Sequence, residues 1–169
     1  MSYGSEFGIE MPDGISPLRF LDPMSRTRTI SAGDIHGDGW PDIALTSDEG
    51  LALFANIGGK SFERQIITND TLDLSKVSKV MMSDIDGDED LDLIAGTFWD
   101  GVYILENTQG SFTTSAVKLP GHIENSTVSA LAIGDLDQDG QLDIVVGNSS
   151  IGNNLSNRCL LYTSDAADD

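Results

Sequence analysis

The chain has little positive charge, one cysteine and no long apolar stretch. Its 169 residues include 9 lysines and arginines against 28 aspartates and glutamates, which gives a formal net charge of −19. Proteins that bind nucleic acid neutralise phosphates with lysine and arginine, so this balance argues against a nucleic-acid partner. No apolar run approaches the roughly 20 residues that a membrane-spanning helix needs. Because Cys159 is the single cysteine, a disulfide framework within the chain is excluded.

What the chain does contain is three acidic segments of nine residues, each followed by a short apolar run. Loop 1 spans residues 34–42, loop 2 spans 84–92 and loop 3 spans 135–143. Carboxylates this close together repel one another unless a cation neutralises them. Their number suits Ca²⁺, which takes about 6–8 oxygen ligands. The alternative is that the acids are solvated turn residues, since Asp and Gly favour turns by themselves; three loops in the same phase favour the cation.

The expected calcium ligands follow from the spacing of the acids within each loop, with the first aspartate counted as position 1. We expect side-chain oxygens from positions 1, 3, 5 and 9, together with the backbone carbonyl oxygen of position 7. The expected ligand residues are Asp34, His36, Asp38, Trp40 and Asp42 in loop 1, Asp84, Asp86, Asp88, Asp90 and Asp92 in loop 2, and Asp135, Asp137, Asp139, Gln141 and Asp143 in loop 3.

The three loops are not equally suited to the ion. Gly39 and Gly140 at position 6 permit the positive φ that wrapping around a cation requires, whereas Glu89 at this position would be strained. His36 at position 3 offers an imidazole nitrogen, which is a poorer partner for Ca²⁺ than a carboxylate. We therefore expect loop 3 to be the best site, loop 2 the next and loop 1 the weakest.

Two features distinguish these loops from EF-hand loops, which begin with a similar acidic pattern. An EF-hand needs a bidentate Glu at position 12 and a helix on each side, but position 12 is Leu45, Ala95 or Val146. The flanks of loop 3, residues 128–133 and 144–146, are short apolar runs rich in β-branched residues, which are typical of strands. Each loop is therefore predicted to join two antiparallel strands.

The loops mark a structural repeat, because they begin 50 and 51 residues apart. After loops 1 and 2 the chain has a third apolar run that ends in Asn56 or Asn107, then a glycine turn, then a fourth run that opens near Phe62 or Phe112. Four short antiparallel strands per unit are typical of a propeller blade. The predicted fold is all-β, a partial β-propeller of four-stranded antiparallel blades with calcium-binding hairpin loops.

These elements resemble the FG-GAP/VCBS-type repeats, the calcium-binding blades also found in integrin α-subunit propellers. The resemblance covers roughly residues 4 to 150 and is specific at the acidic loops, where the following apolar run ends at Gly96 or Gly147. Leu45-Thr46 breaks this ending in the first unit. The resemblance implies a propeller with Ca²⁺ in the hairpins between first and second strands and a secreted or cell-surface location, but it implies no activity.

Both ends of the chain depart from the repeat. Residues 159–169 resemble the translation of a transposase adapter used in short-read sequencing, so we expect a non-native tail there; the alternative is a genuine third strand. Residues 1–22 are expected to hold the end of a preceding blade, the alternative being a simple N-terminal arm. The expected division is 1–22 preceding blade and linker, 23–72 blade with loop 1, 73–123 blade with loop 2, 124–158 truncated blade with loop 3, and 159–169 non-native tail.

No catalytic constellation is visible in the sequence. His36 and His122 are the two histidines, and neither lies beside a serine or cysteine nucleophile in the chain. A carboxylate that binds Ca²⁺ stays ionised and is a poor general acid. We therefore predict a non-catalytic scaffold for adhesion or ligand binding, with neighbouring blades and a protein or glycan ligand as partners and Trp99 as a candidate contact. The alternative is the non-catalytic propeller portion of a secreted enzyme that acts on polysaccharides.

Overall fold

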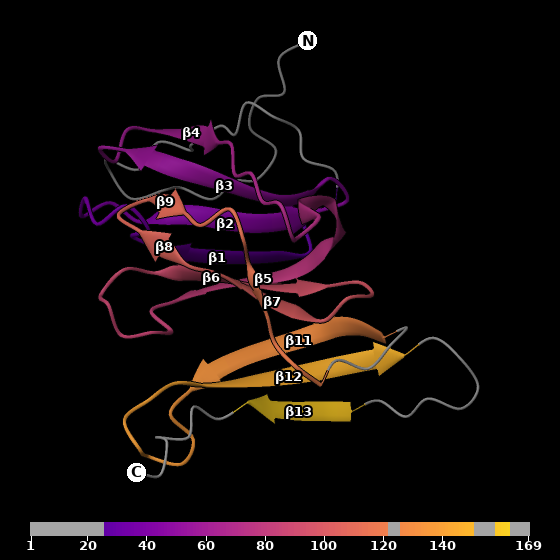
Figure 1. Cartoon of the computed structure of the whole chain (residues 1–169). Helices are drawn as coiled ribbons and strands as arrows, with labels where there is room; N and C mark the ends of the chain where they lie inside the picture. The colour runs from indigo at the N-terminus through magenta and orange to yellow at the C-terminus, as the bar shows by residue number, and fades with distance from the viewer. Residues whose placement is uncertain (1–25, 122–125, 151–157, 163–169) are drawn as a thin grey trace, which may run out of the picture.

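The computed structural model describes residues 26–121, 126–150 and 158–162. All paired strands in these residues are antiparallel, and they form two four-stranded sheets, one three-stranded sheet and one two-stranded hairpin. The three larger sheets follow one another in chain order (Figure 1). The predicted all-β fold of partial-propeller blades is thereby confirmed. Among the described residues, no helix is long and apolar enough to cross a membrane.

Blade 1 is a sheet in which each strand pairs with the next along the chain. Its strands are β1 (Thr29–Gly33), β2 (Asp42–Ser47), β3 (Gly50–Ile57) and β4 (Ser61–Gln65). Loop 1 closes the hairpin between β1 and β2, where Gly33 lies opposite Asp42. The two central strands are largely buried, because their alternating apolar side chains are covered on both faces of the sheet.

Blade 2 has the same order, but its fourth strand is not continuous. Its elements are η1 (Leu74–Lys76), β5 (Val77–Ser83), β6 (Asp92–Thr97), β7 (Val102–Leu105), β8 (Asn107–Thr108), β9 (Ser111–Phe112) and β10 (Val117–Lys118). Between β9 and β10, the carbonyl oxygens of Thr114 and Ala116 accept hydrogen bonds from the Asp70 N–H (2.7 Å) and the Thr71 hydroxyl (3.2 Å). The segment that connects blade 1 to blade 2 thus donates hydrogen bonds to carbonyl groups that, in a continuous fourth strand, would accept them from the third strand.

Blade 3 consists of β11 (Ser126–Gly134), β12 (Asp143–Ser150) and β13 (Arg158–Tyr162). Loop 3 joins β11 to β12, and β13 pairs with β12 from Ile144 opposite Tyr162 to Asn148 opposite Arg158. This strand crosses the expected boundary between blade 3 and the tail, but its pairing does not test where the segment originates. The expected division of the chain remains a prediction, and residues 1–22, His122 and 163–169 lie outside the described residues.

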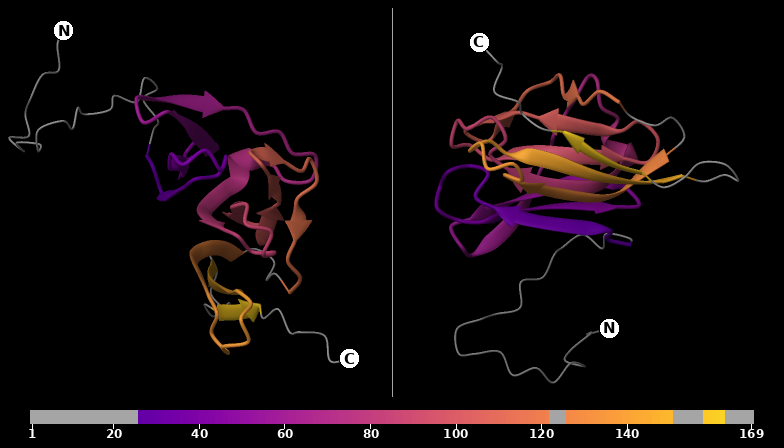
Figure 2. Two further views of the ribbon diagram at one scale, coloured as in Figure 1. Left: turned by 90° about the vertical axis from the view of Figure 1, so that its left-hand side faces the viewer. Right: turned by 90° about the horizontal axis from the view of Figure 1, so that it is seen from below.

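The blades are held together by apolar side chains that alternate between the two faces of the second strand. Ala44 of β2 packs in one cluster with Leu93 and Ala95 of β6. Ile94, which lies between those two residues, points to the opposite face and packs with Val146 of β12. Blade 2 is therefore buried by blade 1 on one face and by blade 3 on the other. The left-hand view of Figure 2 shows the indigo, magenta and orange sheets in this succession.

Two hydroxyl side chains of blade 1 accept hydrogen bonds from backbone N–H groups at the edge of the first strand of blade 2. Thr29 Oγ1 accepts a hydrogen bond from the Val80 N–H (3.2 Å), and Ser31 Oγ accepts one from the Met82 N–H (3.0 Å). These contacts run from β1 of blade 1 to β5 of blade 2, along the edge of β5 that pairs with no other strand among the described residues. Free N–H groups on a sheet edge invite pairing with other chains, so the side chains of one blade protect the edge of the next.

One apolar face is left uncovered among the described residues. Position 2 of the loops is buried in blade 1, where Ile35 is 1% exposed, and half-buried in blade 2, where Ile85 packs against the cluster shared with blade 3. In blade 3 the same position is Leu136, which is 58% exposed. Val145 also points away from blade 2, because it alternates with residues that pack there. Leu136 and Val145 define the outer face of blade 3.

The stacking makes a prediction about equivalent positions in two blades. Ile35→Ala should lower the free energy of unfolding by about 2–5 kcal/mol, because it opens a cavity between blades 1 and 2. Leu136→Ala, the matched change on the outer face, should alter it by no more than about 0.5 kcal/mol. Urea unfolding followed by tryptophan fluorescence measures both. Equal losses would contradict the assignment of position 2 as a contact between blades.

Candidate metal centre

The aspartate at position 9 closes each loop. Asp42, Asp92 and Asp143 begin the second strands of their blades and are 0–1% exposed. In each, Oδ2 accepts a hydrogen bond from the backbone N–H of position 2, at 3.0, 3.1 and 2.8 Å respectively. A carboxylate can be buried here because backbone N–H groups satisfy its oxygens. The residue predicted as a metal ligand is therefore also the anchor of the hairpin.

In blades 1 and 2 a backbone N–H near the end of the third strand, in β3 or at the start of β8, gives this anchor a second donor. Asp42 Oδ1 accepts the Asn56 N–H (2.7 Å), and Asp92 Oδ1 accepts the Asn107 N–H (2.9 Å). The asparagine side chains turn back to the loops: Asn56 Nδ2 donates to the Pro41 carbonyl (3.0 Å). The sequence showed the recurring asparagine, but its link to the carboxylate joins residues 14 or 15 positions apart and has no local signal.

The carboxylate at position 1 organises the tip of each loop. In loop 3, Asp135 accepts hydrogen bonds from the N–H groups of Asp139 (3.1 Å) and Gly140 (3.1 Å). The same two bonds, from positions 5 and 6 to position 1, occur in loops 1 and 2. In all three loops the position 5 carboxylate accepts the N–H of position 7. The tips therefore fold in the same way although their sequences differ.

Two positions in the tip require a positive φ, of which the sequence indicated one. At position 6, Gly39 and Gly140 adopt φ of 87° and 91°, and Glu89 adopts 75°, as expected. Position 4 has the same requirement, and there Gln138 adopts 65°. A non-glycine residue in this region costs about 1–3 kcal/mol. Loops 2 and 3 each carry one such residue, so loop 3 does not have the backbone advantage that the sequence indicated.

Ligating side chains come together in two of the three loops. In loop 2, carboxylate oxygens of Asp84, Asp86 and Asp88 lie within 4.8 Å of one another, and in loop 3 those of Asp135, Asp137 and Asp143 do so. An all-oxygen donor set of this kind fits a hard cation such as Ca²⁺. Within the described part of the chain, loop 1 brings together no comparable set. The full ligand assignment, including the position 7 carbonyl oxygens, remains a prediction.

Proton affinities in these loops reflect the crowding of negative charge. Burial raises the pKa of Asp92 above its ordinary value, although hydrogen bonds from Asn107 and Ile85 oppose the shift. At Asp137 a hydrogen bond from the Asp139 N–H lowers the pKa, but desolvation and three neighbouring carboxylates outweigh it and the pKa rises. A bound cation opposes both shifts, because it stabilises the ionised form.

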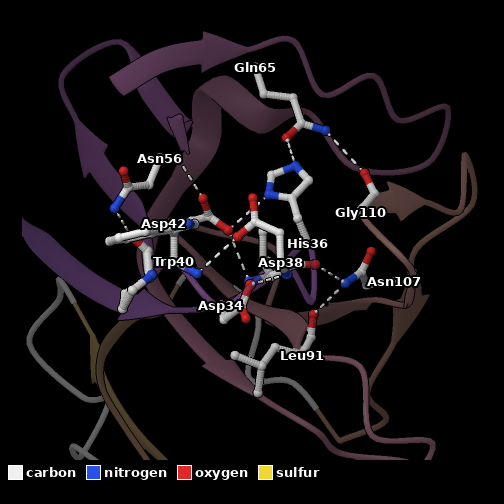
Figure 3. Close-up of polar contacts among 12 residues, drawn as sticks. Asp34, His36, Asp38, Trp40, Asp42, Asn56, Gln65, Leu91, Asn107 and Gly110 are labelled. Atoms are coloured by element: carbon white, nitrogen blue, oxygen red, sulfur yellow. Dashed lines mark hydrogen bonds and ion pairs between the residues drawn. The ribbon is translucent and has the colours of Figure 1, made fainter. Parts of the chain in front are cut away.

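Loop 1 has a different arrangement around His36, which Figure 3 shows. The Gln65 amide nitrogen donates to the Gly110 carbonyl oxygen (3.1 Å), so the Gln65 amide oxygen faces His36 Nε2 at 2.8 Å. On its other side, His36 Nδ1 lies 2.8 Å from Asp42 Oδ2. An amide oxygen and a carboxylate are both acceptors, so each ring nitrogen of His36 faces an acceptor of the protein.

The pKa of His36 agrees with this geometry. Burial, the largest single influence, lowers the pKa, but the hydrogen bond and charge of Asp42, the hydrogen bond to Gln65 and the charge of Asp38 together raise it above its ordinary value. His36 was predicted as a weak metal ligand. Both of its ring nitrogens lie within hydrogen-bonding distance of protein acceptors, Asp42 and Gln65, and its role as a ligand remains a prediction.

The chain matches the FG-GAP-like repeat family at residues 34–95 and again at 84–146. Each matched segment begins at position 1 of one loop and ends in the second strand of the next blade. Together the two segments cover 113 of the 169 residues. No curated protein matches the chain.

The double role of the position 9 aspartate gives a test that separates structure from metal binding. In a chelator, Asp92→Ala should lower the free energy of unfolding by about 2–4 kcal/mol, because a buried donor left unpaired costs about 1–3 kcal/mol and two lose their acceptor. Asp86→Ala at the exposed tip of the same loop should change it by less than about 1 kcal/mol. Denaturant unfolding without metal measures both, and similar losses would contradict the anchoring role.

Proposed function

The chain belongs to the FG-GAP-like repeat family, and on that premise we propose that it is a calcium-binding portion of a β-propeller that acts as a scaffold for ligand binding or adhesion. The observation that carries the proposal is the pair of carboxylate groups in loops 2 and 3, each formed within one hairpin tip. The repetition of the same hydrogen bonds in both tips supports a common role.

Calcium would be held by Asp84, Asp86 and Asp88 in loop 2 and by Asp135, Asp137 and Asp143 in loop 3. The ion would neutralise carboxylates that otherwise repel one another. Asp143 would have two roles in loop 3. It belongs to the carboxylate group proposed to hold calcium, and it is the buried anchor that closes the hairpin by accepting the Leu136 N–H. An ion that binds the folded chain stabilises it by mass action, so calcium would strengthen the blade rather than take part in a reaction.

A secreted or cell-surface location fits this use of calcium. Calcium modules outside cells work at dissociation constants of about 10⁻⁴–10⁻³ M, and exposed tips such as those of loops 2 and 3 suit weak binding of this kind. The histidine that the structure describes, His36, is engaged by Asp42 and Gln65, which favours a non-catalytic module. The same features also fit the alternative role as the non-catalytic propeller portion of a secreted polysaccharide-acting enzyme.

We also propose that a further blade of the same kind covers the outer face of blade 3. The support is internal: position 2 of the loop and the middle of the second strand contact the following blade in blades 1 and 2. Leu136 and Val145 present the equivalent apolar surface without a cover among the described residues. A protein or glycan ligand remains the proposed partner of the assembled scaffold, and Trp99, 50% exposed after β6, is the proposed contact.

Calcium binding is tested by isothermal titration calorimetry and by the midpoint of thermal unfolding. Calcium should raise the unfolding temperature of the wild-type chain. Asp137→Ala should weaken binding at loop 3 at least about tenfold, because one of the three charged ligands is lost. Asp70→Ala removes an exposed acid outside the loops and serves as the matched control. A wild-type chain without a calcium-dependent heat or stabilisation would overturn the proposed function.

The proposal of a covering blade is tested by whether the outer face of blade 3 makes the chain self-associate. Apolar surface without a cover drives association, so the chain should self-associate as its concentration rises. Val145→Lys should reduce this association in sedimentation velocity experiments. Ile66→Lys, at a residue 86% exposed on another part of the surface, should leave it unchanged. Equal effects of the two lysines would count against a specific docking face.

A further inference from the structure

Among the residues that the structure describes, the carboxylate at position 9 makes more hydrogen bonds in loop 1 than in loops 2 and 3. Asp42 Oδ2 accepts hydrogen bonds from both the Ile35 N–H (3.0 Å) and His36 Nδ1 (2.8 Å), and Oδ1 accepts the Asn56 N–H (2.7 Å). Where loop 1 has His36, loops 2 and 3 have carboxylates at position 3, and those carboxylates belong to the groups that fit a cation. Loop 1 therefore places a donor where the others place a metal ligand.

The other side of His36 leads into the next blade. Its Nε2 donates to Gln65 Oε1, and Gln65 Nε2 donates to the Gly110 carbonyl in the hairpin between β8 and β9. The ring packs so closely on this hairpin that a Cβ added at Gly110 would lie 2.5 Å from His36 Cδ2. The hydrogen-bond chain thus runs from the start of β2 in blade 1, through the end of β4, to blade 2.

A second contact crosses the same junction independently. Asn107 Nδ2 donates to the Ile35 carbonyl of loop 1 (2.8 Å) and to the Leu91 carbonyl of loop 2 (3.0 Å), so one amide group joins the two loops. Its position in Figure 3, beside loop 1 but outside the His36 contacts, shows that loop 1 is held to blade 2 at two points. Neither point involves a metal.

We propose that loop 1 is a metal-independent junction, in which the chain of contacts from Asp42 through His36 and Gln65 to Gly110 fixes blade 1 to blade 2. The inference rests on the proposed function in one respect, namely that loops 2 and 3 are the calcium sites. It adds that the three similar loops are held in two different ways, loop 1 by contacts with blade 2 and loops 2 and 3 by an ion.

The backbone of loop 1 is not what sets it apart. Its two positive-φ positions are both glycine, Gly37 and Gly39, whereas loops 2 and 3 carry Glu89 and Gln138 at one such position each. The side chain at position 3 is therefore the difference that matters. His36→Asp would restore carboxylates at positions 1, 3, 5 and 9 in the loop with the least strained backbone.

The first experiment counts calcium ions by isothermal titration calorimetry on wild-type chain and on His36→Asp, both stripped of metal beforehand. The expected result is two ions for the wild type, matching the two carboxylate groups, and three for the variant. Three ions on the wild type would overturn the proposal and leave the proposed function intact. An unchanged count of two in the variant would also overturn it.

The second experiment measures the junction without any metal, by urea unfolding in a chelating buffer. Gln65→Ala should lower the folding equilibrium constant about tenfold, because two part-buried hydrogen bonds are lost. The control is Ser115→Ala, an exposed residue three positions after Phe112 as Gln65 is three after Phe62. If no loop binds calcium, the proposed function fails, and this measurement alone decides the inference. An effect of Gln65→Ala no larger than that of the control overturns the inference whatever the calcium count.

Discussion

The whole arrangement depends on a buried carboxylate at the start of each second strand. Asp42, Asp92 and Asp143 lie at the point where a loop becomes a strand, and each holds the loop closed by accepting the N–H of position 2. Burying an ionised group is costly unless its lone pairs are used. The hairpin and the carboxylate therefore require each other: the backbone donors satisfy the buried oxygens, and the acid fixes the direction in which the rest of the loop projects its side chains.

That fixed direction also determines how the blades stack. Because the second strand begins at the anchor, its following residues alternate in a constant phase, and Ala44 and Ile94 turn toward the next blade. A shift of one residue would exchange the two faces, so the side chains that pack on one neighbouring blade would point to the opposite face. The geometry of the acidic loop and the packing of the blades are thus linked through the register of a single strand.

The sequence predicted the parts of this structure that repeat locally. The spacing of the acids indicated the hairpins, and the period near 50 residues indicated the blades, because both are set by short-range geometry. The break between β9 and β10 was not predictable, since it follows from contacts with residues 69–71 of the preceding connection. The role of His36 was missed for the same reason: its partner Gln65 lies 29 residues away, and the sequence alone offered imidazole only as a poor metal ligand.

The two junctions of the chain consequently differ in what holds them. Between blades 1 and 2 there is a large apolar cluster, the Asn107 amide bridge and the His36 contacts. Between blades 2 and 3 the buried apolar cluster is smaller, five buried residues against twelve. The described hydrogen bonds there include those of the hydroxyls of Ser78 and Thr127, and none comes from a tip. If loops 2 and 3 bind calcium as proposed, removal of the ion would leave the His36 contacts of the first junction in place and would weaken the blades on both sides of the second. A cation can be removed by a chelator and a side-chain contact cannot, so on this proposal blades 2 and 3 would depend on calcium and blade 1 would not.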